Sequence, residues 1–291
     1  MTVAAVALAA CGDGPPPDSP LRPAVQQGEL NVDGQLRTYR VFVPTTLEPG
    51  SRPPLVLVLG GVGNSAENMV SATEFDRQAG VGDFIAAYPQ GLDLTWNAGF
   101  CCASGTTSGV DDVAFLSQLI DLLVSEHDAD PERVYVTGVS AGAMMAYRLA
   151  CELPGQIAGV GSVAGAMVLD RCQPDRGVPV IEIHGTEDQL VPYEGGLVRP
   201  EGVATQPAPP TLAVAERWAA LNGCPAGPEE EIDGLVTTLT WTDCPDGADV
   251  KLVAVEGGGH TWFATGLGPA NGAVDATSLI WDFFSGGQGA A

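Results

Sequence analysis

The chain has 291 residues, of which 45% are hydrophobic, and its 36 acidic against 12 basic residues give a formal net charge of −24. A chain of this length can bury one large core, so we expect a single folded domain without internal repeats. The strong negative charge argues against nucleic acid and bare anionic membranes as partners, because both repel an acidic protein.

The N-terminus has features of an export signal. Residues 3–10 form an apolar run that ends in small residues and is too short to span a bilayer. This run matches the end of a secretory signal, and Leu8-Ala9-Ala10-Cys11 resembles a bacterial lipobox in which Cys11 is acylated. We therefore predict a signal remnant at 1–11, a Pro-rich tether at 12–27 and a folded domain at 28–286.

Predicted strands alternate with predicted helices along the folded domain. Apolar runs or apolar alternation predict strands at 29–32, 37–43, 55–59, 84–88, 133–139, 157–163, 178–183, 231–241 (a hairpin) and 250–255. Apolar residues at helical spacing predict helices at 69–78, 113–123, 141–152, 210–221 and 276–284. This order predicts an α/β fold whose mostly parallel central sheet follows an antiparallel hairpin and carries helices on both faces.

One strand-to-helix junction has the pattern of a nucleophile elbow. Strand 133–139 runs into the motif Gly138-x-Ser140-x-Gly142, and helix 141–152 follows at once. The strand and the helix approach too closely at such a turn for side chains two residues either side of the serine. We therefore predict that Ser140 is a nucleophile; a structural Gly-Ser turn is the alternative.

An activated serine needs a general base and an acid that orients this base. The candidate bases are His127, His184 and His260. His184 and His260 both follow apolar strands, at the sheet edge where Ser140 is expected, and the chain order serine, acid, histidine selects His260. Asp188, shortly after strand 178–183, is the predicted acid, which leaves His184 as a structural residue.

The same geometry predicts an oxyanion hole and a substrate cleft. The N–H of Ala141, directly after the nucleophile, is one donor, and the second is expected from the glycine-rich loop after strand 55–59. In that loop we prefer Val62 to Gly61 as the donor. Trp96 and Trp262, with Gly61, are predicted to line the cleft; core packing is the alternative for each tryptophan.

The cysteines also indicate export. Without Cys11, an even set remains: Cys101, Cys102, Cys151, Cys172, Cys224 and Cys244. Six cysteines are compatible with three disulfides, and we pair Cys224 with Cys244 because they flank a hairpin-like segment. The adjacent cysteines 101 and 102 are not expected to pair with each other, so we expect them to bond to 151 and 172 in an order that stays open. Buried free thiols in a cytosolic protein are the alternative.

Several motifs occur together in a consistent order. They are the stretch from Gly138 to Cys151, His184-Gly-Thr-Glu-Asp188, Trp218 to Cys224, Gly-Gly-Gly-His260-Thr-Trp262 and Trp96-Asn-Ala-Gly-Phe-Cys-Cys102. Together they resemble the secreted polyhydroxybutyrate depolymerase and feruloyl esterase family, including mycobacterial lipoprotein-type members, over residues 28–285. The resemblance implies an α/β-hydrolase fold with 28–286 as the catalytic domain, a Ser140–Asp188–His260 triad and ester substrates.

We accordingly expect an exported serine carboxylesterase that works through an acyl-enzyme and needs no metal or organic cofactor. The resemblance implies a polyhydroxybutyrate-type polyester as the favoured substrate, with plant-wall feruloyl or acetyl-xylan esters as the alternative. No long apolar insertion follows Ile183, so we expect no large lid, and an open cleft suits a polymer or a bulky ester. The loop at 59–62 and Trp262-Phe263 differ from the Leu-His-Gly-Cys-like loop and Trp-Pro of relatives, and both differences lie on the substrate side. A peptidase or acyltransferase, or a non-catalytic surface binding protein on the same fold, are further alternatives. We expect a monomer that reaches the membrane only through a lipid on Cys11.

Overall fold

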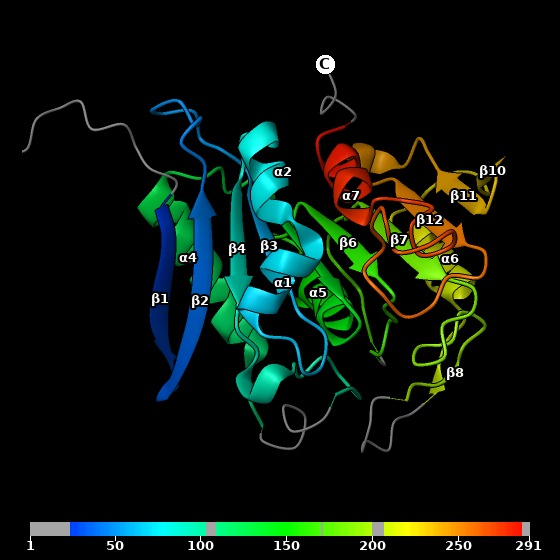
Figure 1. Ribbon diagram of the computed structural model, residues 1–291, viewed down its shortest axis with the longest axis horizontal. Coiled ribbons are helices and arrows are strands. Elements are labelled where there is room, and N and C mark those ends of the chain that lie inside the picture. The colour runs from blue at the N-terminus through cyan, green and yellow to red at the C-terminus, as the bar shows by residue number, and fades with distance from the viewer. Residues whose placement is uncertain (1–23, 103–108, 170, 200–206, 287–291) are drawn as a thin grey trace, which may run out of the picture.

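The computed structural model describes residues 24–102, 109–169, 171–199 and 207–286. The strands of its main sheet are β1 (Ala24–Val32), β2 (Gln35–Val43), β3 (Leu55–Leu59), β4 (Ile85–Pro89), β5 (Val134–Val139), β6 (Gly159–Val163), β7 (Val180–Gly185), β10 (Glu229–Asp233), β11 (Val236–Trp241) and β12 (Val250–Val255). They lie in the order β1-β2-β4-β3-β5-β6-β7-β12-β11-β10 (Figure 1). The strands from β4 to β12 in this order are parallel, and an antiparallel pair borders them on each side.

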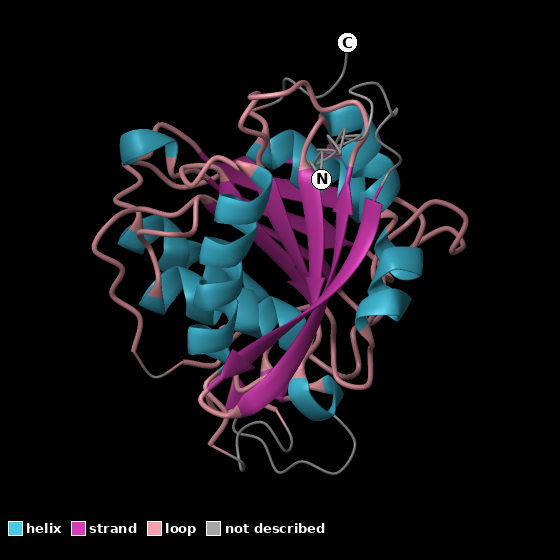
Figure 2. Ribbon diagram, turned by 90° about the vertical axis from the view of Figure 1, so that its left-hand side faces the viewer, coloured by secondary structure: helices cyan, strands magenta, loops and turns pink. Residues whose placement is uncertain are grey.

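Helices cover both faces of the sheet, as predicted. The helices are α1 (Ala66–Thr73), α2 (Phe75–Gly82), α4 (Asp112–His127), α5 (Ala141–Glu152), α6 (Thr211–Leu221) and α7 (Ala276–Phe284). Helices α1, α2 and α7 share one apolar core with the sheet, and α4, α5 and α6 share the other. Figure 2 shows the twisted sheet enclosed between the two layers of helices. A separate two-stranded ladder joins β8 (Gly196–Leu197) and β9 (Pro207–Ala208).

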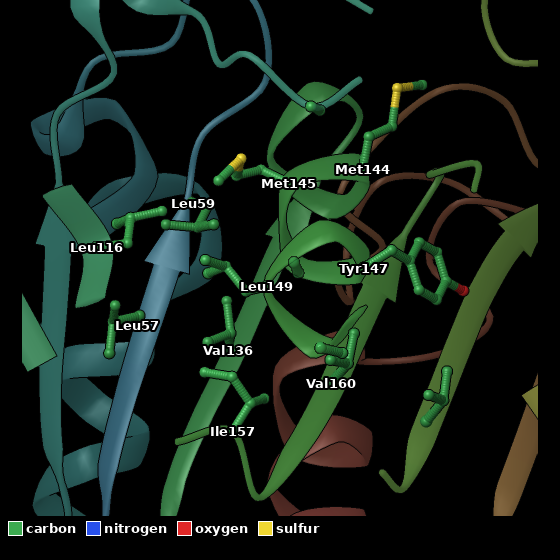
Figure 3. Close-up of a cluster of buried hydrophobic side chains, with 14 of the residues drawn as sticks. Leu57, Leu59, Leu116, Val136, Met144, Met145, Tyr147, Leu149, Ile157 and Val160 are labelled. Atoms are coloured by element: carbon green, nitrogen blue, oxygen red, sulfur yellow. The ribbon is translucent and has the colours of Figure 1, made fainter. Parts of the chain in front are cut away.

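Strand β3 illustrates how the sequence specifies the layers. All five of its residues are fully buried, as its continuous apolar run predicted. Leu57 and Leu59 point into the core on the side of α5, where Figure 3 shows them near Leu149, whereas Val56 and Val58 belong to the core on the side of α1 and α2. Because β3 is held from both faces, the loop that follows it has a fixed starting point.

Two of the differences between predicted and observed boundaries concern the kind of structure formed. The helix expected at 69–78 is divided into α1 and α2 at Glu74, whose left-handed backbone (φ 52°) ends one helix and precedes the next. Residues 24–27, expected to belong to the tether, are part of the strand Ala24–Val32, which pairs along its whole length with β2. Backbone hydrogen bonds hold this edge strand, and the exposed side chains of Val25, Gln26 and Gln27 left no apolar pattern to read.

The disulfides correct one prediction and match another. Cys224 is bonded to Cys244, as predicted. Cys151 is bonded to Cys172, whose Cα atoms lie 5.1 Å apart, within the usual range for a disulfide. The prediction that Cys101 and Cys102 would bond to these two residues was therefore wrong: the two adjacent cysteines are bonded to each other. The expectation was that adjacent cysteines do not pair easily, but the bond between Cys151 and Cys172 leaves the two neighbours to bond to each other.

The predicted lipid attachment residue, Cys11, and most of the predicted tether lie outside the described residues. Among the helices of the described ranges, none is long and apolar enough to cross a membrane.

Candidate active site

Ser140 lies at the sharp turn between β5 and α5. Its backbone adopts φ 55° and ψ −120°, a strained conformation for a residue with a side chain. The turn is tight on both sides: a Cβ atom on Gly138 would lie 2.6 Å from the carbonyl carbon of Gly142, and one on Gly142 would collide with the carbonyl oxygen of Leu59. The two glycines thus allow α5 to begin directly beside the serine, as the elbow motif predicted.

His260 and Asp188 meet although they are 72 residues apart in the chain, and His260 lines the same cleft as Ser140. The Nδ1 atom of His260 lies 2.7 Å from Oδ2 of Asp188. The other carboxylate oxygen, Oδ1, accepts the backbone N–H groups of Leu190 and Val191 at 2.8 and 2.9 Å. With both oxygens engaged, the carboxylate can hold the imidazole in the tautomer whose free Nε2 serves as a base.

The loops that carry these two residues are tied to each other. The N–H of Glu187 donates to the carbonyl oxygen of Gly258 at 2.9 Å, and the N–H of Gly257 donates to Oγ1 of Thr186, also at 2.9 Å. The loops approach so closely that a Cβ on Gly185 would collide with the backbone of Gly258. Gly185 and Gly258 are therefore needed for this close contact, which sets the position of the imidazole relative to Asp188.

The predicted oxyanion donors border the serine from two elements. Ala141 is the first residue of α5, so its N–H has no acceptor within the helix. The loop after β3 forms a turn closed by the N–H of Asn64 and the carbonyl oxygen of Gly61, at 3.1 Å, with Val62 inside it. A Cβ on Gly61 would lie 3.2 Å from the Cβ of Ser140, so this turn lies directly against the serine.

A cleft of about 1000 Å³ opens above these residues, and Ser140 and His260 both line it. Its other walls come from α1 and α2, from the loop after β3, from the segment after β7 and from the loop after His260. Among the residues that line the cleft are Gly61, Val62, Leu190, Trp262 and Leu267. The serine thus lies at the bottom of an accessible hollow rather than in a sealed core.

The two tryptophans predicted for the cleft differ. Trp262 lines it with part of its ring, while its Nε1 donates to Oγ1 of Thr277 at 3.1 Å and the residue is only 6% exposed. Trp96 is 1% exposed and is not among the cleft residues. Its Nε1 donates to the carbonyl oxygen of Gly60 at 2.9 Å, so it fastens the loop that carries Gly61 and Val62 instead of contacting a ligand.

Sequence reasoning missed the surroundings of Asp188. His184, expected to be structural only, is fully buried with its Nε2 3.4 Å from Oδ2 of Asp188. Burial alone would raise the pKa of Asp188, but its hydrogen bonds with His184 and His260 outweigh burial and hold this pKa well below its usual range. Asp188 is therefore a carboxylate throughout the neutral pH range. The signal in the sequence was the polar Glu182 and His184 inside an otherwise apolar strand.

Comparison with known proteins gives a consistent result. The family model described as Esterase PHB depolymerase matches residues 38–189. The putative esterase NocK of Nocardia uniformis subsp. tsuyamanensis is 33% identical over 80% of this chain and 73% of that protein. A probable feruloyl esterase C of Aspergillus niger is 25% identical over 90% and 88% of the two chains. Feruloyl esterase B of Piromyces equi is 29% identical over 77% of this chain but only 42% of its own length.

Solved structures share the fold at lower sequence identity. An acetyl xylan esterase from Aspergillus awamori superposes with a TM-score of 0.63 at 16% identity, covering 89% of this chain and 99% of that one. Thermogutta terrifontis esterase 2 gives a TM-score of 0.60 at 17% identity, covering 94% and 98%. At these identities the likeness concerns the arrangement of the sheet and its helices.

Proposed function

Because the chain belongs to the esterase family of PHB depolymerase and has the α/β-hydrolase fold, we propose that this carboxylesterase cleaves a polyester of the hydroxyalkanoate type through Ser140. The observation that carries the proposal is the placement of Ser140 and His260 in one cleft, with Asp188 2.7 Å from the imidazole. The structural comparisons support the fold. The substrate and the roles of the catalytic residues are our proposal.

The proposed reaction has two halves. His260 Nε2 takes the proton from Ser140 Oγ, which attacks the ester carbonyl carbon, while Asp188 stabilises the imidazolium that forms. The negative oxygen of the tetrahedral intermediate accepts hydrogen bonds from the N–H groups of Ala141 and Val62. The alcohol leaves with the proton from His260, and an acyl-enzyme remains. Water then gives a proton to His260 and attacks the acyl carbon. The bond from this carbon to Ser140 Oγ breaks, Oγ takes the proton back from His260, and the acid leaves.

The rim of the cleft favours a polymeric, apolar substrate. Val62, Leu190 and Leu267 line the cleft and are 40%, 42% and 50% exposed. Large exposed apolar side chains grouped around a cleft are typical of a binding surface, because leaving them in water is unfavourable. A hydrophobic polyester chain laid across this rim would cover them while one ester bond enters the cleft.

Feruloyl or acetylxylan esters are the second candidate. The relatives named feruloyl esterases and the structural neighbour named an acetyl xylan esterase favour it. The two candidates share the same chemistry and differ in what occupies the cleft beyond the ester bond.

The test compares product release from polyhydroxybutyrate particles, methyl ferulate and acetylated xylan, with Ser140→Ala as the control. We expect wild type to release 3-hydroxybutyrate products and Ser140→Ala to release none. Release of ferulate or acetate without hydroxybutyrate products would refute the polyester as the substrate and support the plant-wall ester. Equal rates for wild type and Ser140→Ala would refute the assignment of the nucleophile.

The rim can be tested separately. The double variant Leu190→Ser/Leu267→Ser should lower the rate on polyester particles much more than the rate on a soluble p-nitrophenyl ester, because only the particle contacts the rim. Ile232→Ser is the matched control, since this residue is 68% exposed on β10 and is not among the cleft residues. Equal losses on particle and soluble ester would contradict the role of the rim.

The three disulfides indicate that the chain works in an oxidising, extracytoplasmic compartment. We also propose that it is a monomer and that a lipid on Cys11 anchors it to the membrane, which the lipobox-like sequence supports. Expression in a bacterial host with detergent phase partitioning tests the anchor. Wild type should enter the detergent phase and Cys11→Ser should not, and light scattering should give the mass of one chain.

A further inference from the structure

A second set of buried polar side chains continues from Asp188 into the core. Alternate residues of β7 face opposite sides of the sheet, so Ile181 and Ile183 enter one core while Glu182 and His184 face α5. The Nδ1 atom of His184 lies 2.9 Å from Oε1 of Glu182, and these residues are 0% and 2% exposed. Buried charged groups are costly unless they are paired, so this arrangement calls for an explanation.

The partners of His184 determine its protonation. Its Nε2 lies 2.8 Å from the carbonyl oxygen of Val191, which can only accept a hydrogen bond, and 3.4 Å from Oδ2 of Asp188. The Nε2 atom must therefore carry a proton. The Nδ1 atom faces Glu182, so the pair is either a carboxylate with an imidazolium or a carboxylic acid with a neutral ring.

Donors around Glu182 decide between these two forms. The hydroxyl group of Tyr147 donates to Oε2 at 2.7 Å, and the N–H of Gly165 points at Oε1 from 3.4 Å. Figure 3 shows the hydroxyl of Tyr147 pointing away from the apolar cluster around α5. Donors directed at both oxygens stabilise the carboxylate, so Glu182 is negative and His184 carries a proton on each nitrogen.

This places a positive charge beside the acid of the proposed triad. His184 Nε2 and His260 Nδ1 face the same oxygen of Asp188, at 3.4 and 2.7 Å. The imidazolium of His184 and the ring of His260 therefore hold the same carboxylate oxygen from two sides.

We propose that Glu182 and His184 form a buried ion pair that positions Asp188 for its contact with His260. The proposal rests on the proposed function, because it assumes that Asp188 and His260 serve Ser140. Both members act through Asp188 and are positioning residues: they contact neither the cleft nor a substrate among the described residues.

The charged and titratable surroundings agree with this assignment. The groups facing the pair are Tyr147 on α5, Asp188 after β7, Tyr193 in the segment that follows, whose ring centroid is 5.9 Å from that of His184, and His260 beyond Asp188. Burial would lower the pKa of His184, but its hydrogen bonds with Asp188 and Glu182 and the charge of Glu182 raise it to about 9.

Nuclear magnetic resonance tests the protonation of His184 without any activity measurement. The chain contains only three histidines, so the ring nitrogen signals of ¹⁵N-histidine-labelled protein can be assigned by elimination with His127→Gln and His260→Gln. We expect one ring with both nitrogens protonated from pH 6 to pH 8. A His184 signal that shows a single protonated nitrogen at pH 7 would overturn the proposal, whatever the enzyme hydrolyses.

The pH dependence of kcat/KM tests the effect of the ion pair on Asp188 and His260. The variant Glu182→Gln/His184→Gln replaces the ion pair with two neutral amides of similar size. The variant removes the cation that lies 3.4 Å from Asp188 together with the carboxylate on the far side of that cation. Because the cation is the nearer charge, the acid limb of kcat/KM on a soluble p-nitrophenyl ester should move upward by up to about 1 pH unit. Trp218→Phe is the control for a destabilised core: this buried ring stacks on Tyr147 at 5.8 Å and carries no charge, so it should lower Tm and leave the limb in place.

The outcomes are distinguishable. An acid limb that moves in the double variant but not in Trp218→Phe supports the proposal, and limbs that coincide in all three proteins overturn it. Full turnover by Ser140→Ala would refute the proposed function, and with it the effect on the base, while the resonance experiment would still decide whether the ion pair exists.

Discussion

Gly142 is the residue at which the elbow is most sensitive to a single added methyl group. A Cβ at this position would meet the carbonyl group of Leu59, and it would also lie 2.7 Å from the carbonyl oxygen of Gly60. These atoms belong to the backbone and cannot rotate away, unlike the end of a flexible side chain. In Gly142→Ala, α5 and the loop after β3 must therefore separate, which moves Val62 and Ala141 relative to Ser140.

The magnitude follows from the type of contact. Overpacking a core commonly costs about 1–3 kcal/mol, and a clash with fixed backbone belongs at the upper end. A loss of about 3 kcal/mol corresponds to a decrease in Tm of roughly 6–12 °C for a domain of this size. Misplacing one oxyanion donor should lower kcat by a factor of about 10² to 10³.

Calorimetry and soluble-ester kinetics measure both effects, and Gly80→Ala is the matched control. Gly80 lies inside α2, and a Cβ there would meet no atom within 4 Å. Because alanine favours a helix over glycine, this variant should keep its activity and gain about 0.5–1 kcal/mol. A Gly142→Ala protein with the Tm and kcat of wild type would refute the reasoning about the elbow.

Three further outcomes follow from the structure. Trp96→Phe removes the hydrogen bond from Nε1 to Gly60 and should lower kcat by about tenfold with little change in KM, because the oxyanion loop loosens while the cleft walls remain; a rise in KM alone would instead indicate contact with substrate. Cys151→Ala/Cys172→Ala opens a loop with a sequence separation of 21 and should destabilise the fold by about 3 kcal/mol in chemical denaturation, with kcat/KM unchanged. His184 has a folded-state pKa of about 9 against an ordinary value of 6.5, so its contribution to stability is complete below pH 6.5 and is lost as the pH rises through 9. The free energy of unfolding should therefore fall by about 3 kcal/mol more in wild type than in Glu182→Gln/His184→Gln between pH 6.5 and pH 9.5, and parallel curves for the two proteins would contradict this.

Local patterns predicted the frame of the molecule well. The run Leu55–Leu59 specified a strand buried on both faces, and the glycines around Ser140 specified a tight strand-to-helix turn, because both signals depend only on neighbours in the chain. The alternation of strands and helices was enough for the fold class. The pairing of Cys224 with Cys244 was also readable, since one hairpin brings them together.

Contacts between distant segments were harder to predict. Asp112, the first residue of α4, is 1% exposed and bonded to Arg37 of β2 at 2.7 Å, a contact that the sequence did not indicate. Trp96 was predicted to line the cleft, but its Nε1 donates a hydrogen bond to the carbonyl oxygen of Gly60. Nothing in the local sequence indicates which buried group a polar side chain will meet, so these roles emerge only from the folded arrangement.

The role of His184 shows the same limit most clearly. Its position after an apolar strand allowed a structural or a catalytic role. Only the fold shows that Glu182, Val191 and Asp188 surround it with oxygen atoms. A polar pair inside a strand that is otherwise apolar is the one sign that the sequence offered.

Labelling with a fluorophosphonate probe tests the central claim most directly, because the probe forms a covalent bond only with an activated serine. We expect intact-mass analysis of the folded wild-type protein to show a single adduct, and peptide mapping to place it on Ser140. Ser140→Ala should show no adduct, and His260→Gln should react much more slowly. An adduct on another serine, or a folded wild-type protein that does not react, would contradict the assignment of Ser140 as the nucleophile of this esterase.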